Sequence, residues 1–137
     1  WHAIARMYNQ QAAKHDFTMA MGFVLLNINT EGTPATKIAP LMGLEARSLT
    51  RLLKTMEEKK LVSRKVDQKD KRSVRVFLTE KGKERKEESR QVVMDFNNTV
   101  KKEVAPQHMH IFFDVLQRIN HIVEKKSLAL KADQINS

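Results

Sequence analysis

Residues 38–82 have the sequence IAPLMGLEARSLTRLLKTMEEKKLVSRKVDQKDKRSVRVFLTEKG, and the fold of the chain is decided there. From Glu45 onward the apolar residues recur at the spacing of one helix face, which predicts a helix with a narrow buried stripe. The residues of this stripe are Leu49, Leu52, Leu53 and Met56. A shorter helical segment precedes it and ends at Gly43, so the two helices are expected to form a helix-turn-helix.

The hydrophobic pattern changes directly after this helix. Residues 61–66 (LVSRKV) and 73–78 (SVRVFL) alternate apolar and polar side chains, which favours two strands over a helix. The segment 67–72 between them is polar and suits the tip of a hairpin. A helix-turn-helix that is followed by a β-hairpin is a winged helix, and the hairpin is its wing.

On the N-terminal side the pattern predicts three helices. Residues 1–15 form an amphipathic segment, and Asp16 or Thr18 can cap a second helix. The expected core residues of the second helix are Met21, Val24, Leu25 and Ile28. Thr33 is then expected to cap the third helix, with Pro34 in its first position. The residues of the third helix that are expected to face inward are Ile38, Leu41 and Met42.

On the C-terminal side, Thr79 can cap a long helix over residues 79–104 that is polar at its start, and Pro106 begins a final helix. The final helix carries more apolar surface than the core of a small winged helix needs. This surplus indicates a helical interface, with a core inside the same chain as the alternative. The residues concerned are Ile111, Phe112, Val115, Leu116, Ile119 and Ile122.

The positive charge of the chain is concentrated in one segment. The 137 residues contain 25 Lys and Arg against 16 Asp and Glu, a net charge of +9. Residues 45–86 alone carry 15 Lys and Arg against 7 Asp and Glu, a net charge of +8. Such a segment is typical of a surface that binds a polyanion, and the composition favours nucleic acid over an anionic membrane.

Several function classes lack the residues that they need. The chain has no Cys, which excludes a disulfide scaffold, a thiol sensor and a zinc finger. Its longest apolar run, Met19–Leu26, is far shorter than the roughly 20 residues of a membrane-spanning helix. No nucleophile motif or phosphate-binding glycine loop is present, and His108 and His110 are two apart, so they cannot chelate together from one helix. We expect no enzyme, no cofactor, no metal site, no membrane contact and a cytoplasmic setting.

The order of these elements, together with four motifs, resembles the MarR family of dimeric bacterial transcription regulators. The motifs are Leu-Thr-Arg at 49–51, Leu-Val-x-Arg at 61–64, Asp-x-Arg at 70–72 and Leu-Thr-x-x-Gly at 78–82. One departure is Lys60, where the family usually has Gly. Gly would end the recognition helix in a left-handed conformation, and a non-Gly residue costs about 1 kcal/mol there.

The pattern and the resemblance together predict a mainly α fold with a small β-hairpin wing, in which a winged helix-turn-helix is joined to terminal helices that form a dimerisation region. The predicted winged helix-turn-helix DNA-binding domain covers 16–82, and the connecting helix covers 79–104. The helical dimerisation region covers 1–15 and 105–137, and by resemblance its apolar residues form the interface of a homodimer.

The recognition helix offers five candidate DNA-binding residues, because side chains near its N-terminus reach base edges in the major groove. Arg47 suits a two-pronged contact with guanine, Arg51 a base or a phosphate, and Lys54 a phosphate. Ser48 and Thr50 suit hydrogen bonds to either. The alternative for this stripe is an ordinary solvated helix face.

The wing offers three more candidates, Lys69, Lys71 and Arg72, which suit contact in or beside a minor groove. By resemblance Arg72 is the arginine of the wing tip, while solubility is the alternative role for the two lysines. Asp70 is expected to be structural, because a carboxylate near phosphates is repelled. Its expected partner is one of three arginines: Arg64, Arg72 or Arg75. Arg64 and Lys65 are further candidates for phosphate contacts.

These features predict a sequence-specific regulator of transcription that binds double-stranded DNA as a homodimer at a pseudo-palindromic site. The resemblance implies a repressor that is relieved by a small-molecule effector, often aromatic or phenolic, whose binding residues the sequence does not assign. The alternative is a sequence-indifferent architectural DNA-binding protein, which would share the basic segment but would not need Arg47 and Ser48 at a helix N-terminus.

Overall fold

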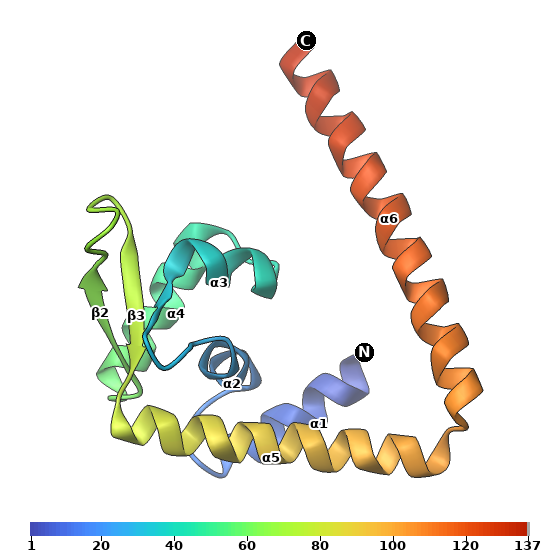
Figure 1. Ribbon diagram of the computed structural model, residues 1–137, viewed down its shortest axis with the longest axis horizontal. Helices are drawn as coiled ribbons and strands as arrows, with labels where there is room; N and C mark the ends of the chain where they lie inside the picture. The colour runs from blue at the N-terminus through green and yellow to red at the C-terminus, as the bar shows by residue number, and fades with distance from the viewer. Residues whose placement is uncertain (137) are drawn as a thin grey trace. The chain divides into compact units, whose positions relative to one another are not determined.

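The computed structural model describes residues 1–136, with side chains through Lys131 (Figure 1). The elements are α1 (His2–Ala13), α2 (Met19–Leu26), β1 (Thr33–Pro34), α3 (Ala35–Met42), α4 (Ala46–Glu58), β2 (Val62–Val66), β3 (Val74–Leu78), α5 (Glu80–Glu103) and α6 (Pro106–Asn136). They form two compact units, of which the first is Trp1–Asp95 and the second begins at Phe96. Ser137, the last residue of the predicted dimerisation region, lies outside the described residues.

The first unit contains the predicted winged helix. β2 and β3 pair antiparallel from Val62 opposite Leu78 to Val66 opposite Val74, and β1 pairs with the other edge of β3. The mainly helical fold with a small antiparallel wing is therefore confirmed, and both predicted strands lie within one residue of their expected bounds.

A hydrophobic core lies between α2, α3, α4 and the sheet (Figure 1). The four core residues predicted for the second helix are all buried: Met21, Val24, Leu25 and Ile28. Most of the predicted stripe of α4 is buried as well. The largest fully buried side chains are Leu25, Ile28, Ile38, Leu53, Met56, Leu61, Val24 and Val76. Because α4 uses one stripe for this core, its opposite face is left to the solvent.

The start of the third helix differs from the prediction. Thr33 and Pro34 form strand β1, opposite Val76 and Arg75, and α3 begins only at Ala35. The Thr33 hydroxyl does not cap α3, because it accepts a hydrogen bond from the backbone N–H of Asn29 at 2.9 Å. The prediction of a Thr33 cap with Pro34 as the first helical residue is therefore wrong, and the sheet has a third strand.

Leu41 is also placed differently from the prediction. Its side chain is 69% exposed, whereas Ile38 is fully buried and Met42 is partly buried against the core. The inward arc of α3 is completed by Ala35 and Ala39, and Leu41 lies outside that arc on the 3.6-residue repeat. Gly43 ends the helix in the left-handed conformation at φ 61°, as predicted.

The cap of α2 is Thr18, one of the two predicted candidates. The Thr18 hydroxyl oxygen accepts a hydrogen bond from the N–H of Met21 at 3.3 Å. Asp16, the other candidate, has a left-handed backbone, and its carboxylate forms an ion pair with Lys59 at 2.8 Å. This ion pair joins the turn after α1 to the end of α4.

The second unit contains the last turns of α5 and the helix α6, which begins at Pro106 as predicted. The six apolar residues predicted as a dimer interface are exposed, from 39% at Leu116 to 59% at Ile111. Within the described residues, no helix combines the length and the apolar composition that crossing a membrane requires.

Candidate nucleic-acid interface

Helix α4 presents the five predicted DNA-binding residues to the solvent. Leu49, Leu53 and Met56 anchor one side of the helix in the core, each at most 2% exposed. The other side is exposed along three helical turns, starting in the first turn after Glu45. The exposed residues on it are Arg47, Ser48, Thr50, Arg51 and Lys54.

The cations on this face are available to an external anion. Among the described residues, Arg47, Arg51 and Lys54 form no ion pair with a carboxylate, and the helix carries no acidic residue in its first turn. The Thr50 hydroxyl donates to the carbonyl of Ala46 at 2.9 Å. Its proton is therefore used within the helix, and its oxygen remains able to accept a hydrogen bond from a base amino group.

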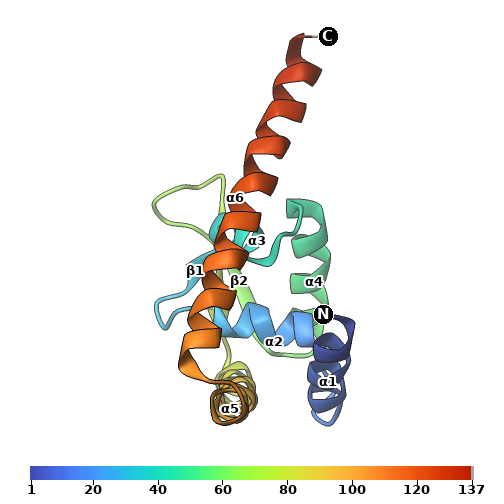
Figure 2. The same cartoon turned by 90° about the vertical axis from the view of Figure 1, so that its right-hand side faces the viewer.

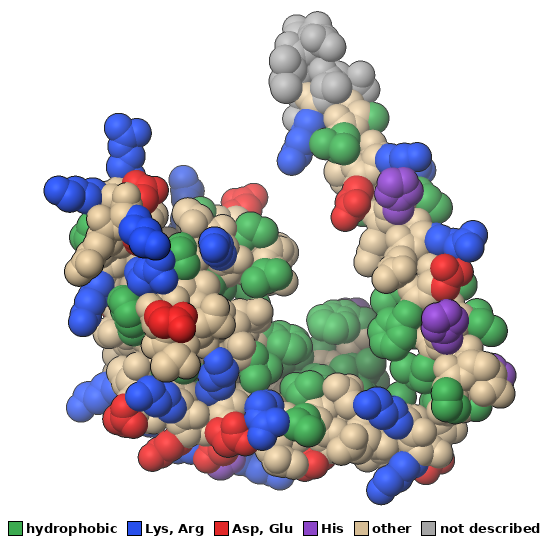
Figure 3. Space-filling view, in the orientation of Figure 1, with side chains coloured by type: hydrophobic (Ala, Val, Ile, Leu, Met, Phe, Trp, Pro, Cys, Tyr) green, Lys and Arg blue, Asp and Glu red, His purple; other side chains and the backbone are tan. Residues whose placement is uncertain are grey.

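The wing tip carries the other three predicted cations. Lys69, Lys71 and Arg72 are all exposed, and Lys and Arg side chains gather over this end of the first unit (Figure 3). The backbone of the tip is ordered by carboxylates. Asp67 accepts from the N–H of Lys69 at 2.8 Å, and Asp70 accepts from the N–H of Arg72 at 3.0 Å.

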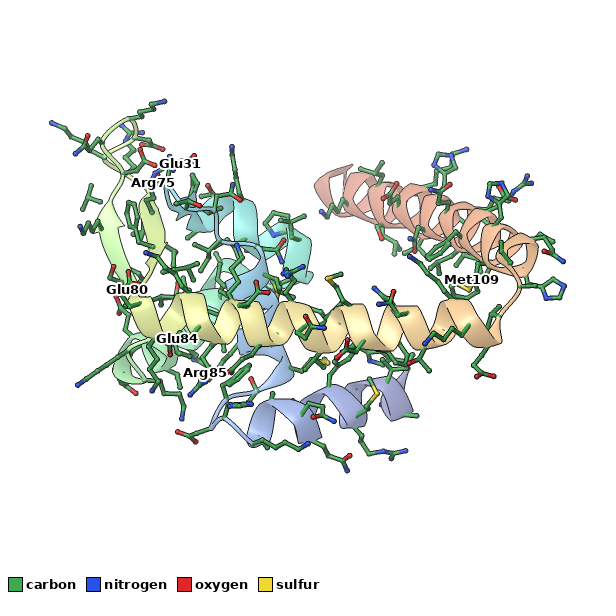
Figure 4. The ribbon with its side chains drawn as sticks, turned by 60° about the horizontal axis from the view of Figure 1, so that its bottom comes forward. Glu31, Arg75, Glu80, Glu84, Arg85 and Met109 are labelled. Carbon is green, nitrogen blue, oxygen red and sulfur yellow. The ribbon has the colours of Figure 1, made fainter. Side chains whose placement is uncertain are left out.

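The ion pair that holds the wing uses Asp67 rather than Asp70. Asp67 is 4% exposed, and its Oδ2 accepts from Arg75 Nε at 2.9 Å. Arg75 also donates through Nη1 to the carbonyl of Gly32 at 2.9 Å, which ties the wing to the turn before β1. Figure 4 shows Arg75 near the tip end of β3, beside Glu31 from that turn. The expectation that Asp70 pairs with an arginine side chain is therefore corrected.

The electrostatics of Asp67 follow from these contacts. The hydrogen bond from the backbone of Lys69, with smaller contributions from Asp70 and Arg75, holds the pKa of the Asp67 carboxyl below its ordinary value. Burial opposes this effect. An ionised Asp67 is thus part of the folded wing.

A second ion pair joins the wing to the recognition helix. Glu57 near the end of α4 accepts from the Arg64 guanidinium at 2.7 Å and from the backbone N–H of Arg64 at 3.0 Å. The Arg64 side chain lowers the pKa of Glu57. Arg64 of the Leu-Val-x-Arg motif is thus engaged inside the fold, while Lys65 lies over the ring of Phe77 at 5.4 Å.

The base of the wing is fastened to α5 by the Leu-Thr-x-x-Gly motif. The Thr79 hydroxyl accepts from the N–H of Gly82 at 3.0 Å, as the predicted cap requires, and donates to the carbonyl of Lys60 at 2.6 Å. A Cβ on Gly82 would overlap the carbonyl oxygen of Leu61 and lie 3.0 Å from its carbon. The glycine therefore permits the close approach of α5 to the start of β2.

Lys60 has the left-handed backbone that the resemblance led us to expect at this position, with φ 58°. Its N–H donates to the carbonyl of Glu57 at 2.8 Å, and the N–H of Leu61 donates to Met56 at 2.9 Å. These bonds satisfy carbonyls at the end of α4. A lysine here keeps the turn geometry of a glycine at a cost in strain.

The sequence analysis missed the carboxylates that position the candidate DNA-binding surfaces. Asp67 directly follows a predicted strand, and an Asp whose side chain accepts from the N–H two residues on is a common turn former, so this signal was present in the sequence. Glu57 gave no comparable signal, because its partner Arg64 belongs to a different element. Within the described residues no three His, Asp or Glu side chains gather as a metal site.

Residues 17–74 match the family model described as the MarR family. The winged helix of this chain is thus similar to that of the MarR family. The match begins just before α2 and ends at the start of β3, so it covers the helix-turn-helix and most of the wing.

Two curated relatives are transcriptional regulators by name. The chain is 37% identical over 83 residues to TtmR of Methylorubrum extorquens, covering 60% of this chain and 43% of that protein. It is 35% identical over 81 residues to SarZ of Staphylococcus aureus, covering 58% of this chain and 55% of that protein. The chain thus spans about half the length of the curated relatives that it matches. Neither name is that of an enzyme, which agrees with the expectation.

Solved structures share the fold of nearly the whole chain. The S. aureus MepR–DNA complex has a TM-score of 0.81 at 21% identity, covering 89% of this chain and 91% of that one. The structure of the regulator SlyA has a TM-score of 0.79 at 21% identity, covering 91% of this chain and 89% of that one. A mutant MarR from E. coli in complex with operator DNA gives 0.72 at 25% identity, covering 83% of each.

Proposed function

We propose that this chain is a transcription regulator that binds double-stranded DNA at a specific sequence. The observation that carries the proposal is the pair of exposed cationic surfaces, on α4 and on the wing tip, that have no carboxylate partners among the described residues. Both surfaces belong to one unit, and the Glu57–Arg64 ion pair joins their elements at 2.7 Å. The relatives named as regulators and the DNA complexes of MepR and MarR support the same function.

In this proposal each surface has its own role in recognition. Helix α4 enters the major groove, where Arg47 reads a guanine and Arg51 reads a base or holds a phosphate. Lys54 contacts a phosphate, and Ser48 and the Thr50 oxygen add hydrogen bonds. The wing tip, with Lys69, Lys71 and Arg72, lies in or beside the adjacent minor groove, whose negative potential attracts arginine.

The active form is proposed to be a homodimer on a pseudo-palindromic site. The support is the apolar face of α6, whose six predicted interface side chains are 39% to 59% exposed in the single chain. A patch of that kind on a helix is typical of a protein interface. Ile119→Lys is expected to shift the chain to monomer in sedimentation velocity, while Gln117→Lys on the opposite side of α6 leaves the dimer intact. An unchanged dimer in Ile119→Lys would refute this interface.

The proposed mode of action is repression by occlusion of promoter DNA in a cytoplasmic, nucleoid-associated setting, with relief by a small-molecule effector. Relief requires that the effector bind more tightly to a state whose two recognition helices do not fit the operator. A sequence-indifferent architectural role is the competing function. It predicts similar affinity for all duplexes, whereas base reading by Arg47 predicts about 1–3 kcal/mol of discrimination at one position.

The wing provides a direct test of the DNA-binding surface. The triple variant Lys69→Ala, Lys71→Ala and Arg72→Ala is compared with a triple variant of α6, Lys125→Ala, Lys126→Ala and Lys131→Ala. The affinity for a labelled duplex is measured by fluorescence anisotropy over a range of salt concentrations. Each lost phosphate contact lowers the slope of log K against log salt by about 0.9. The wing variant is expected to lose slope and the α6 variant to keep it, and equal slopes in both would contradict the proposal.

A further inference from the structure

Two apolar side chains are exposed near the tip of the wing. Val66, the last residue of β2, is 64% exposed, and Val74, the first residue of β3, is 36% exposed. The two residues lie directly opposite each other in the antiparallel register, so their side chains share one face of the hairpin and form a small patch. This valine pair lies between the buried part of the wing and its cationic tip.

The valine pair lies on the face of the hairpin that is turned toward α4. Side chains two residues apart on a strand share a face, so the pair shares its face with Arg64 and Val76. Val76 is fully buried in the core, and the Arg64 guanidinium donates to Glu57 of α4. The valine pair therefore continues the α4 side of the sheet beyond the end of the core.

The other face of the hairpin is occupied by contacts within the fold. Lys65 lies over the ring of Phe77 at 5.4 Å. Arg75 donates to Asp67 and to the carbonyl of Gly32, each at 2.9 Å. Charged and aromatic side chains thus satisfy one another on that face, whereas the α4 side ends in an apolar patch that is open to the solvent.

Cations flank the valine pair in two directions. The tip beyond it carries Lys69, Lys71 and Arg72, all exposed. The exposed face of α4 carries Arg51 and Lys54. Figure 2 shows the wing loop and α4 on the same side of the first unit, away from α5. In the proposed function, α4 enters the major groove and the wing tip lies at the adjacent minor groove, so the DNA strand that separates these grooves passes the face with the valine pair.

The sugar is the part of this DNA strand that suits an apolar patch. Its phosphates are the natural partners of the flanking cations, while each deoxyribose between two phosphates presents mainly carbon-bound hydrogens. Covering a sugar with two valine side chains removes apolar surface of both partners from water, which is favourable. Contacts with the sugars and phosphates position a protein on the duplex without reading its sequence.

We propose that the valine pair, Val66 and Val74, packs against the deoxyribose backbone of the DNA strand between the two grooves and so positions the wing. The inference rests on the proposed function, to which it adds an apolar contact with the DNA backbone. The competing role is stabilisation of the hairpin alone, since cross-strand pairs of β-branched residues stabilise a sheet.

Threonine separates the two roles. It has the shape of valine and a similar preference for strands, but it carries a hydroxyl in place of one methyl group. A role in the hairpin is therefore largely kept by threonine, whereas an apolar contact with the sugar is weakened. Isoleucine is the matched control, because it is β-branched and stays apolar.

The test compares the parent chain with two double variants, Val66→Thr with Val74→Thr and Val66→Ile with Val74→Ile. Fluorescence anisotropy measures the affinity for a labelled duplex of about 25 base pairs and mixed sequence between about 50 and 300 mM salt. The threonine variant is expected to bind at least about fivefold more weakly at each salt concentration, and the isoleucine variant within about twofold of the parent. The slope of log K against log salt is expected to be that of the parent in both variants, because no phosphate contact is lost.

Three results would overturn the inference. A threonine variant with unchanged affinity would leave the hairpin role alone, and the proposed DNA function would stand. A lowered salt slope would place the loss in the phosphate contacts instead. A changed oligomeric state in sedimentation velocity, with unchanged DNA affinity, would assign the valine pair to a protein interface.

The failure of the proposed function is recognised separately. A parent chain that binds no duplex removes that function and the inference with it, whereas a difference between variants requires a parent chain that binds. Circular dichroism melting establishes that each variant is folded. The single variant Val66→Thr changes the more exposed valine and tests the same contact even if the double variant unfolds, with an expected loss of at least about twofold in affinity.

Discussion

Replacing Gly82 by alanine tests the close approach of α5 to the wing. The added methyl group would overlap the backbone carbonyl of Leu61, which also accepts the N–H of Thr79 at 3.1 Å. This carbonyl is part of the backbone and cannot rotate away as a side chain can. The first turn of α5 therefore has to move. The move also disturbs the hydrogen bond between the Thr79 hydroxyl and the N–H of Gly82.

The expected cost follows from these contacts. Overpacking a tight site costs about 1–3 kcal/mol, and each buried polar group left without its partner costs about 1–3 kcal/mol more. We therefore expect Gly82→Ala to lower the free energy of unfolding by about 3–5 kcal/mol, a large share of the roughly 5–15 kcal/mol that stabilises a typical domain.

The assay is urea unfolding followed by circular dichroism, with Gly43→Ala as the matched control. Gly43 has the left-handed φ of 61°, and a Cβ there meets nothing within 4 Å. Its replacement is expected to cost only about 1 kcal/mol of backbone strain. Two results would refute the argument from the Leu61 carbonyl. One is a free energy of unfolding for Gly82→Ala within about 1 kcal/mol of that of the parent chain, and the other is a Gly43→Ala variant that loses as much stability as Gly82→Ala.

Three further predictions concern the turn, the wing and the recognition helix. Lys60→Gly relieves the left-handed strain at φ 58° and is expected to raise the free energy of unfolding by up to about 1 kcal/mol in urea titrations; a loss of stability would contradict the strain. The pKa of Asp67 is lowered in the folded state, so its contribution to stability is present above the ordinary Asp pKa of about 4 and is lost as the pH falls through the lowered value. Melting curves between pH 7 and pH 2.5 should therefore show the parent chain more stable than Asp67→Asn by a constant margin at higher pH, with a margin that shrinks below about pH 4; a margin that is independent of pH would contradict the role of the charge. Arg47→Ala is expected to relax specificity at one base position, whereas Lys54→Ala weakens all sequences alike and lowers the salt slope by about one; equal weakening of specific and random DNA by both variants would exclude base reading by Arg47.

Most of the fold could be predicted from the sequence because its elements have strong periodic signals. The burial of Met21, Val24, Leu25 and Ile28 follows from one helical stripe, and that of Leu49, Leu53 and Met56 follows from another. The two wing strands follow from alternation, and Gly43 and Pro106 mark the end of α3 and the start of α6.

The errors arose where tertiary contacts decide the local structure. A two-residue strand such as Thr33–Pro34 has no period of its own, and its partner β3 lies about forty residues further along the chain. Leu41 is apolar but lies beyond the edge of the core. Its exposure becomes evident only from the side of α3 that packs against the other elements. The Asp-x-Arg motif drew attention to Asp70, while the buried ion pair formed between Asp67 and Arg75, eight residues apart across the hairpin. The exposure of the candidate DNA-binding residues on α4 was predictable because an exposed face is the complement of a buried stripe, and their contact with DNA stays a prediction.

The central claim is sequence-specific recognition of double-stranded DNA by α4 and the wing. The most direct measurement is a competition binding assay at about 150 mM salt, with the DNA upstream of the gene that encodes this chain against a scrambled duplex of equal length and composition. The account predicts nanomolar affinity for the upstream DNA and a preference of at least roughly a thousandfold over the scrambled duplex. Equal micromolar affinity for both duplexes would contradict sequence-specific recognition of that site, and equal affinity across a selection of genomic fragments would leave only the architectural role.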